Sequence, residues 1–506
     1  MNNPLLRLLL ARLNEAQTDL NRLGLYASGR TLGVNGSFWK GRKGKGGDMT
    51  QVLTSLVQDD QIGPAIKRIV DGQLDKDPDW QAVEGALTLV YSGAVVPEGS
   101  SESVRPDERV DAMTTWHTDA ALITALRSAA WAYQWAGRMV LRVYIPDEYR
   151  DLIESRESWT LAEALELVHV QSVDPRDGGP VIDAHGRVLG YFFAYQVSDP
   201  VRRTTTKWVE FHTQDTVQLY QRVGGLALNP VGEPMPNPLY DETRLGSRRR
   251  EYLMWHADRL GGTAITPSAI DAQDRLNASN TYMGRNDDMT GFRMIVTGNA
   301  ETPVDDLGKP TTWKAGPDVV ITLIGIPKDD RDNPTDGGRE TPTFQIIDPV
   351  DPRTHSIPSI NHWGRKVMAA FDQGWAADGE LEVSGESKRV SRKPHDKRVI
   401  FASVDTGAGM AWALRAGLML ASSLVSEEAL REAAAIRFRP RMYLDVDSVN
   451  LAEYLAKLSA YEKGALDLES VLESTPSITD VASVKARVQA EQAAKAKEAG
   501  TGAAGA

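Results

Sequence analysis

The densest positive charge in the sequence is a run of basic side chains between residues 388 and 398. Lysine and arginine at this density can neutralise nucleic-acid phosphates, pair with carboxylates of another subunit, or form the solvated face of a helix. The sequence leaves these three alternatives open. The candidate residues are Lys388, Arg389, Arg392, Lys393, Lys397 and Arg398.

Residues that carry out catalysis or bind metals do not occur at the spacings that these functions require. The eight histidines include no His-x-x-x-His or His-Glu-x-x-His pair, and there is no Gly-x-Ser-x-Gly motif. Cysteine is absent, which excludes disulfides, thiolate nucleophiles and cysteine-ligated zinc. We therefore expect no catalytic residue, no metal and no cofactor, and that the protein is not an enzyme. His117, beside Trp116, is interpreted as a core or interface residue and not as a ligand.

Two polar loops resemble ligand-binding motifs in composition alone. Gly41–Gly47 is rich in Gly and Lys, but no Ser or Thr follows Lys45, as a phosphate-binding Walker loop requires. Asp329–Asp336 is acidic, but Pro334 interrupts it and the ligand spacing of a calcium loop is missing. We interpret both segments as solvated loops.

The formal net charge is −12. This acidic balance argues against a protein that binds nucleic acid over a broad surface, because such binding depends on neutralising phosphates. It is compatible with a conduit, in which nucleic acid must slide without sticking.

Two apolar stretches were considered as membrane segments. Met1–Leu20 is interrupted by Arg7 and Arg12, which is typical of an amphipathic helix and not of a signal peptide. Ala408–Val425 has about the minimum length for a span, and Arg415 near its middle would cost about 2.5–3.5 kcal/mol in a bilayer. We expect a buried helix there and no membrane partner.

The elements that position these residues follow from the spacing of apolar side chains. Apolar residues recur every three to four positions from Val110 to Tyr133, which predicts a long helix that stops at Gly137. Alternation over Met139–Ile145 then predicts a strand. From Leu167 to Tyr240 we expect an antiparallel β-region, ending in an exposed connection with four prolines between Pro230 and Pro238.

A long polar helix is predicted from Thr266 to Thr290, with Thr266 as N-cap and Pro267 at the first helical position. At 1.5 Å per residue it would be about 37 Å long. A helix that is polar on all sides is rarely stable alone, so it needs neighbours. Its candidate functional residues are Asp271, Asp274, Arg275, Arg285, Asp287 and Asp288.

Mixed elements follow this helix, so the sequence predicts an α+β fold. A β-containing insertion precedes an amphipathic helix over Ser359–Trp375, and its strand candidates are Phe292–Val296, Val319–Ile326 and Phe344–Ile347. A long helical tract then reaches Glu432 and can bend at Pro394 or at Gly407–Gly409. A strand is expected over Arg441–Val446 before a C-terminal helical region.

Several segments resemble, in order and spacing, the portal family of tailed bacteriophages, particularly the siphophage type. The resemblance covers about residues 20–480, most of the chain. The matching segments are a helix-then-strand pair over Trp116–Leu141, a Ser…Ile-Asp-Ala…Asn run over Ser268–Asn277, a Ser-Gly-Glu-Ser turn within Val383–Arg389, and the closing segments Phe438–Asp447 and Gly464–Ser470.

The resemblance implies a ring, usually of twelve copies, around an axial channel. Its regions map to an N-terminal wing over 1–265, stem helices over 266–290 and 359–375, a clip over 291–358, a tunnel loop over 376–386, a long helix and wing strand over 387–447, and a crown and tail over 448–506. In such a ring, neighbouring copies would flank the polar stem helix. The candidate tunnel-loop residues are Asp378, Gly379, Glu380, Ser384, Gly385 and Glu386.

The family also implies a location and partners. The ring would lie at the portal vertex of the virion, after assembly in the host cytoplasm, and would pass double-stranded DNA. Its other partners would be the terminase large subunit, a head–tail adaptor, and the major capsid and scaffolding proteins. Another virion ring or adaptor protein is the first alternative, and a multi-domain hydrolase, which the missing motifs disfavour, is the second.

Overall fold

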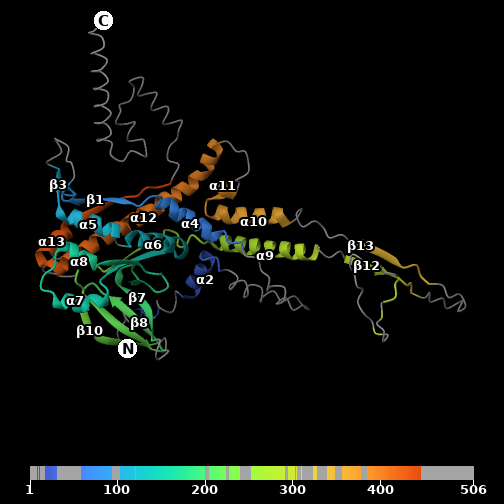
Figure 1. Ribbon diagram of the computed structural model, residues 1–506, viewed down its shortest axis with the longest axis horizontal. Helices are drawn as coiled ribbons and strands as arrows, with labels where there is room; N and C mark the ends of the chain where they lie inside the picture. The colour runs from blue at the N-terminus through green and yellow to red at the C-terminus, as the bar shows by residue number, and fades with distance from the viewer. Residues whose placement is uncertain are drawn as a thin grey trace, which may run out of the picture. The chain divides into compact units, whose positions relative to one another are not determined.

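The computed structural model describes residues 8–9, 11, 17–30, 59–93, 103–119, 121–199, 204–223, 227–239, 252–290, 294–302, 304, 309, 323–326, 339–347, 356–377 and 385–445. Helices combine with largely antiparallel sheets, which confirms the predicted α+β class. The chain divides into two compact units (Figure 1). Unit 1 comprises Met1–Ser28, Ile62–Thr266 and Met368–Ala506; unit 2 comprises Gly29–Gln61 and Pro267–Val367.

Unit 1 is built around the long helix α12 (Gly385–Val425). Within the described part of the chain, it is the one helix long and apolar enough to cross a membrane, but Met410, Leu414 and Leu418 are fully buried in the protein core. Its last part is therefore the buried helix expected over Ala408–Val425. The other helices of unit 1 are α2 (Gln17–Ala27), α4 (Ile62–Gln73), α5 (Glu108–Asp119), α6 (Leu122–Ala136), α7 (Arg150–Ser155), α8 (Leu161–Glu166), α11 (Gly374–Ala377) and α13 (Glu427–Ala435), with a 3₁₀ turn at Asp147–Tyr149.

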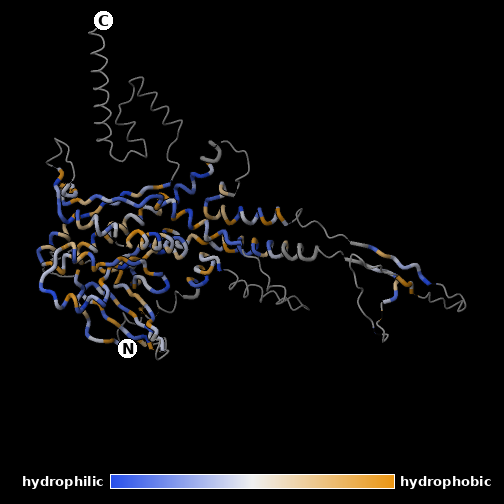
Figure 2. The backbone as a smooth tube through the Cα atoms, in the orientation of Figure 1, coloured by the Kyte–Doolittle hydropathy of each residue, from blue (hydrophilic) through white to orange (hydrophobic). Residues whose placement is uncertain are grey.

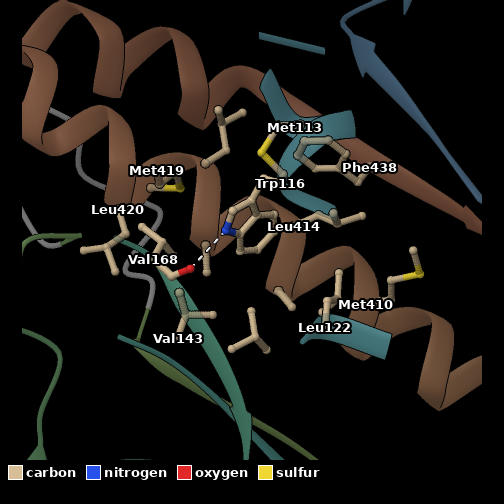
Figure 3. Packing of buried hydrophobic residues seen from close by; sticks show 14 of the residues in the cluster. Met113, Trp116, Leu122, Val143, Val168, Met410, Leu414, Met419, Leu420 and Phe438 are labelled. Carbon is tan, nitrogen blue, oxygen red and sulfur yellow. Dashed lines mark hydrogen bonds between the residues drawn. The ribbon is translucent and has the colours of Figure 1, made fainter. Parts of the chain in front are cut away.

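Trp116 of α5 lies at the centre of this core (Figure 3). Its indole Nε1 donates a hydrogen bond of 3.0 Å to the carbonyl of Val168, which satisfies the polar end of a buried ring. On α12, Gly417 leaves room for the ring, because a Cβ added there would lie 2.8 Å from Cη2 of Trp116. The fit fixes α5 against α12.

Three sheets belong to unit 1. The sheet of four strands has the order β14-β1-β2-β3, the sheet of three has β11-β4-β5, and the sheet of five has β10-β9-β8-β7-β6. Strands β4 and β11 and the sequential strands β6 to β10 all pair antiparallel. The strands are β1 (Asp79–Glu84), β2 (Leu87–Val90), β3 (Val104–Pro106), β4 (Arg138–Tyr144), β5 (His169–Ser172), β6 (Gly178–Ile182), β7 (Val188–Asp199), β8 (Thr204–His212), β9 (Thr216–Val223), β10 (Ala227–Pro236), β11 (Met254–Asp258) and β14 (Ile436–Arg441).

The predicted change from helix to strand at Gly137 is confirmed. Gly137 ends α6 with a φ of 76°, and a Cβ there would meet the backbone of Gly262 at 2.7 Å, so both conformation and space require glycine. The single helix predicted over Val110–Tyr133 is wrong, because α5 ends at Asp119 and α6 begins at Leu122. Both helices bury apolar faces, so the helical spacing continues across the interruption and hides it.

Two further predictions are corrected. The proline-rich segment predicted as a connection forms strand β10, which pairs with β9 alone. An edge strand tolerates proline because one side of its backbone needs no hydrogen-bond partner. The strand predicted at Arg441–Val446 lies earlier in the chain, as β14. The long helical tract is interrupted at Ser426, which caps α13 by accepting a hydrogen bond from the backbone amide of Ala429.

Unit 2 contains the predicted polar helix as α9 (Pro267–Thr290). Helix α10 (Ser356–Ala370) lies beside it up to Val367: Ser279 and Ser359 are joined by a hydroxyl hydrogen bond of 3.2 Å, and the Arg275 guanidinium lies 5.1 Å from the Trp363 ring. Between the two helices the chain forms an antiparallel pair, β12 (Met294–Gly298) and β13 (Thr343–Ile347). Figures 1 and 2 show these elements, with hydrophilic residues recurring along the coloured part of α9.

Candidate functional site

The basic run lies in the first part of α12. Lys388 and Arg389 belong to this helix, but their side chains lie outside the described residues. The remaining four side chains divide into two groups by their surroundings. Arg392 and Arg398 are half-buried, while Lys393 and Lys397 are exposed.

Both arginines are held by carboxylates of the same chain. Arg392 contacts Asp396 one turn later at 3.0 Å, and its Nη2 donates to the backbone carbonyl of Asp445 at 2.7 Å and lies 3.0 Å from its Oδ1. Burial alone would lower the pKa of Arg392, but its contacts with Asp445 and Asp396 raise it on balance. Arg398 Nη2 donates to Oδ2 of Asp372 at 2.6 Å. Pairing within the chain was not among the three alternatives considered for the run.

Asp372 owes its position to an unusual backbone conformation. Its φ of 59° places it in the left-handed region, which ends α10 before the short α11 and turns the carboxylate toward α12. The predicted helix Ser359–Trp375 is therefore two helices separated by this residue. The interruption supplies the partner of Arg398.

Lys393 and Lys397 have no ion pair within the described parts of the chain. Lys397 lines a cavity of about 320 Å³ together with Arg259, Arg398, Asp372 and Phe401. Burial lowers the pKa of Arg259, and the nearby charge of Arg398 lowers it further. Three cations and one carboxylate thus border the cavity, so its net charge favours an acidic group from outside.

The tunnel-loop candidates are largely outside the described residues. This holds for Asp378, Gly379, Glu380 and Ser384, while Gly385 and Glu386 open α12 with undescribed side chains. The candidates Arg285, Asp287 and Asp288 lie in α9, and their side chains are likewise undescribed.

The polarity of α9 has a partner in the same chain. The amide of Asp59 donates to Oδ1 of Asn277 at 3.1 Å, the amide of Gln61 donates to Oε1 of Gln273 at 3.0 Å, and Asn280 donates to Asp59 at 3.3 Å. These bonds anchor residues 59–61 along α9. Part of the need for neighbours that we inferred from the sequence is therefore met within unit 2.

The predicted stem residues differ in exposure. Asp271 and Arg275 are exposed on α9, and Asp274 is buried. Arg275 lies over the Trp363 ring, as described above. On the described part of α9, two of the predicted charges are thus available at the surface.

A buried polar network in unit 1 escaped the sequence analysis. Arg142 of β4 contacts Glu210 of β8 at 2.6 Å, and Nε2 of the buried His212 lies 3.3 Å from the same carboxylate oxygen. The Arg142 guanidinium also lies 4.7 Å from the Phe193 ring. Alternation along a strand could have placed Glu210 and His212 on one face, but nothing local pairs them with a residue on another sheet.

His117 is half-buried on α5, where burial lowers its pKa. Its Nε2 has no hydrogen-bond partner in the described part of the structure. No cluster of three or more His, Asp or Glu side chains that could hold a metal ion occurs among the described residues.

A cavity of about 900 Å³ lies in unit 1 among α5, α8, α12 and α13. Its walls include Trp116, Leu165 and Val168, and several carboxylates stand among its lining residues, including Glu108 and Glu432. Arg109, which also lines it, pairs with Asp107, Glu84 and Glu432. The cavity shares no residue with the basic run.

Comparisons with known proteins give a distant structural likeness. No protein-family model matches the chain, and no curated protein matches it. Among solved structures, a chain from the neck of an empty GTA particle, computed with C6 symmetry, aligns with 84% of this chain and 92% of its own length. The identity is 13% and the TM-score is 0.41, and at this level the likeness carries no inference about this protein.

Proposed function

We propose that this chain is a portal subunit of a tailed bacteriophage, which forms a homo-oligomeric ring at one capsid vertex. The observation that carries the proposal is the arrangement of unit 2: a polar helix α9, a partner helix α10 beside it, and the pair β12–β13 on the connection between them. This order is what the sequence resemblance implies for a stem and clip.

The surface of α9 supports a ring. Asp271 and Arg275 carry opposite charges, lie four residues apart and are exposed on one helix face. In a ring, such a face would lie against neighbouring copies or a water-filled channel, where exposed charge is tolerated. The number of copies, usually twelve in the family, belongs to the proposal.

The charge distribution supports a passage for double-stranded DNA. The chain carries 69 acidic and 57 basic residues, and two of the basic side chains of the α12 run are bound to carboxylates of the chain. Contact with DNA would therefore be weak, as sliding requires. The proposed subunit performs no catalysis; the terminase large subunit would supply the work of packaging, and the adaptor, capsid and scaffolding proteins would be its other partners.

Electron microscopy of the purified chain tests the proposal. At micromolar concentration we expect negatively stained closed rings with a central channel, and a homogeneous population of monomers would count against it. Co-expression with the scaffolding and major capsid proteins separates the proposal from a head–tail adaptor. A portal is built into the empty shell, whereas an adaptor attaches after filling.

A further inference from the structure

The first part of α12 has its polarity reversed. Its inward side carries His395, Asp396, Ser403 and Thr406, all buried. On its outward side four large apolar residues are exposed: Val390 by 51%, Ile400 by 43%, Phe401 by 73% and Val404 by 66%. In a helix with one face on the core and the other in solvent, large apolar side chains lie mainly on the inward face.

Three of these four buried polar side chains are paired, while Nδ1 of His395 has no hydrogen-bond partner in the described part of the structure. Thr406 donates to Gln73 of α4 at 2.8 Å, Ser403 donates to the backbone carbonyl of Ile400 at 2.7 Å, and Asp396 binds Arg392. The inward side is filled by these polar side chains together with the buried Val399 and Ala402, and Phe401 and Val404 lie on the other side. A group of exposed large apolar side chains of this kind marks a surface that binds another molecule.

The exposed residues form one continuous stripe. Val390, Lys393, Lys397, Ile400, Phe401 and Val404 follow one another at intervals of three or four residues, apart from the adjacent pair at 400 and 401, which places them on one helix face. Leu260, 97% exposed, lines the cavity that Lys397 and Phe401 also line. We name this face, from Val390 to Val404, the α12 stripe.

We propose that the α12 stripe is covered by a second copy of this chain, through an acidic, partly apolar surface of that copy. The inference rests on the proposed ring and identifies one of its contacts. A copy with a net charge of −12 offers an excess of carboxylates to Lys393 and Lys397. Phosphate backbones would satisfy the lysines but would leave Phe401 and Val404 without apolar partners, because protein–DNA interfaces are predominantly polar and charged.

The lysines also determine the kind of contact. Two α12 stripes placed face to face would bring four ammonium groups together, which like-charge repulsion disfavours. The stripe of one copy must then face a different surface of the next. Contacts of this head-to-tail kind generate a ring where the rotation between copies closes, whereas two identical faces produce a dimer.

Substitutions on the stripe test the inference. The double variant Phe401→Asp, Val404→Asp should raise the protein concentration at half-assembly by roughly tenfold or more, as loss of central interface residues does. The double variant Lys393→Glu, Lys397→Glu replaces two exposed side chains. It should also weaken assembly, because it would place carboxylates against the acidic surface of the next copy. Leu152→Asp, on the exposed face of α7, is the matched control and should assemble normally. Circular dichroism confirms that each variant is folded.

Cross-linking identifies the covering partner. Because the chain has no cysteine, Val404→Cys provides a single attachment point for a benzophenone maleimide, and Ala184→Cys, in the exposed β6–β7 turn, is the control. In mixtures of nitrogen-15-labelled and unlabelled protein we expect cross-links between copies from position 404. Without the benzophenone group, we expect no disulfide between two Val404→Cys copies, because two stripes do not face each other. Cross-links confined to one chain, or to added duplex DNA, would overturn the inference.

The two proposals fail in different ways. If the unmodified chain forms rings and the double aspartate variant forms them equally well, the assignment of the α12 stripe is wrong and the ring stands. If the unmodified chain stays monomeric, both proposals are wrong.

Discussion

His212 is a buried histidine whose charge state bears on stability. Burial lowers its pKa below the ordinary value, although Glu210 opposes the shift. The folded protein thus favours the neutral imidazole. A group of this kind adds stability that is fully present above the unfolded pKa of about 6.5 and is lost as the pH falls below it.

We therefore expect the midpoint of thermal unfolding to fall as the pH is lowered from 7.5 to 5.5, and to fall less steeply in His212→Gln. Scanning fluorimetry across this range measures both slopes. His185→Gln, in an exposed turn, is the control and should keep the slope of the unmodified protein. An unchanged slope in His212→Gln would show that other groups account for the dependence.

Gly417 allows the closest approach of α12 to Trp116. The ring cannot retreat, because it is buried and its Nε1 is bonded to Val168, so Gly417→Ala should destabilise the protein by about 1–3 kcal/mol. Gly364→Ala in α10 meets open space and should instead stabilise by about 0.4–1 kcal/mol. Chemical denaturation compares the two. Equal changes in the free energy of unfolding would mean that helix propensity, and not packing, determines the effect of Gly417→Ala.

At the scale of elements, residues 59–61 and α9 act together. Asn277→Ala removes the acceptor that the half-buried Asp59 amide and Nε2 of the buried Gln273 share, which costs about 1–3 kcal/mol. We expect faster hydrogen exchange at Asp59 and Gln61. Asp271→Ala, on the exposed side of α9, should leave both amides unchanged, and exchange that responds equally to either variant would contradict a specific role for Asn277.

Elements defined by local signals could be predicted from the sequence. The helix end at Gly137 and the strand β4 after it follow from a glycine and a change of apolar period, and α9 follows from the cap Thr266-Pro267. Strand β10 was missed because prolines mark turns more often than edge strands. The pairing of β1 with β14 joins segments about 350 residues apart, for which no local pattern exists.

In the candidate site, too, local features could be predicted from the sequence and long-range contacts could not. A run of basic residues is visible in the sequence, but its partners Asp372 and Asp445 are set by the end of α10 and by the chain beyond β14. The reversed polarity of α12 is hidden as well. Apolar and polar residues alternate there at helical spacing, and the sequence does not say which side faces inward.

At the scale of the whole molecule, the acidic balance predicts weak binding to DNA. We expect duplex DNA to bind the assembled protein no more tightly than the non-specific range of about 10⁻⁴–10⁻⁶ M at physiological salt. Fluorescence anisotropy with a labelled duplex measures this. At a protein concentration at which the variant still assembles, Lys393→Glu, Lys397→Glu should change this affinity little, because the stripe is assigned to another copy of the protein. A large loss would assign these lysines to DNA.

Helix α12 is a single segment of 41 residues that carries the exposed stripe at one end and the core residues Met410, Leu414 and Leu418 at the other. If a second copy covers the α12 stripe, as proposed, folding of unit 1 and association of copies share one element and are linked by mass action. The temperature at which unit 1 melts should rise with protein concentration. At low protein concentration, copies that have no neighbour on the α12 stripe would then be the first to unfold.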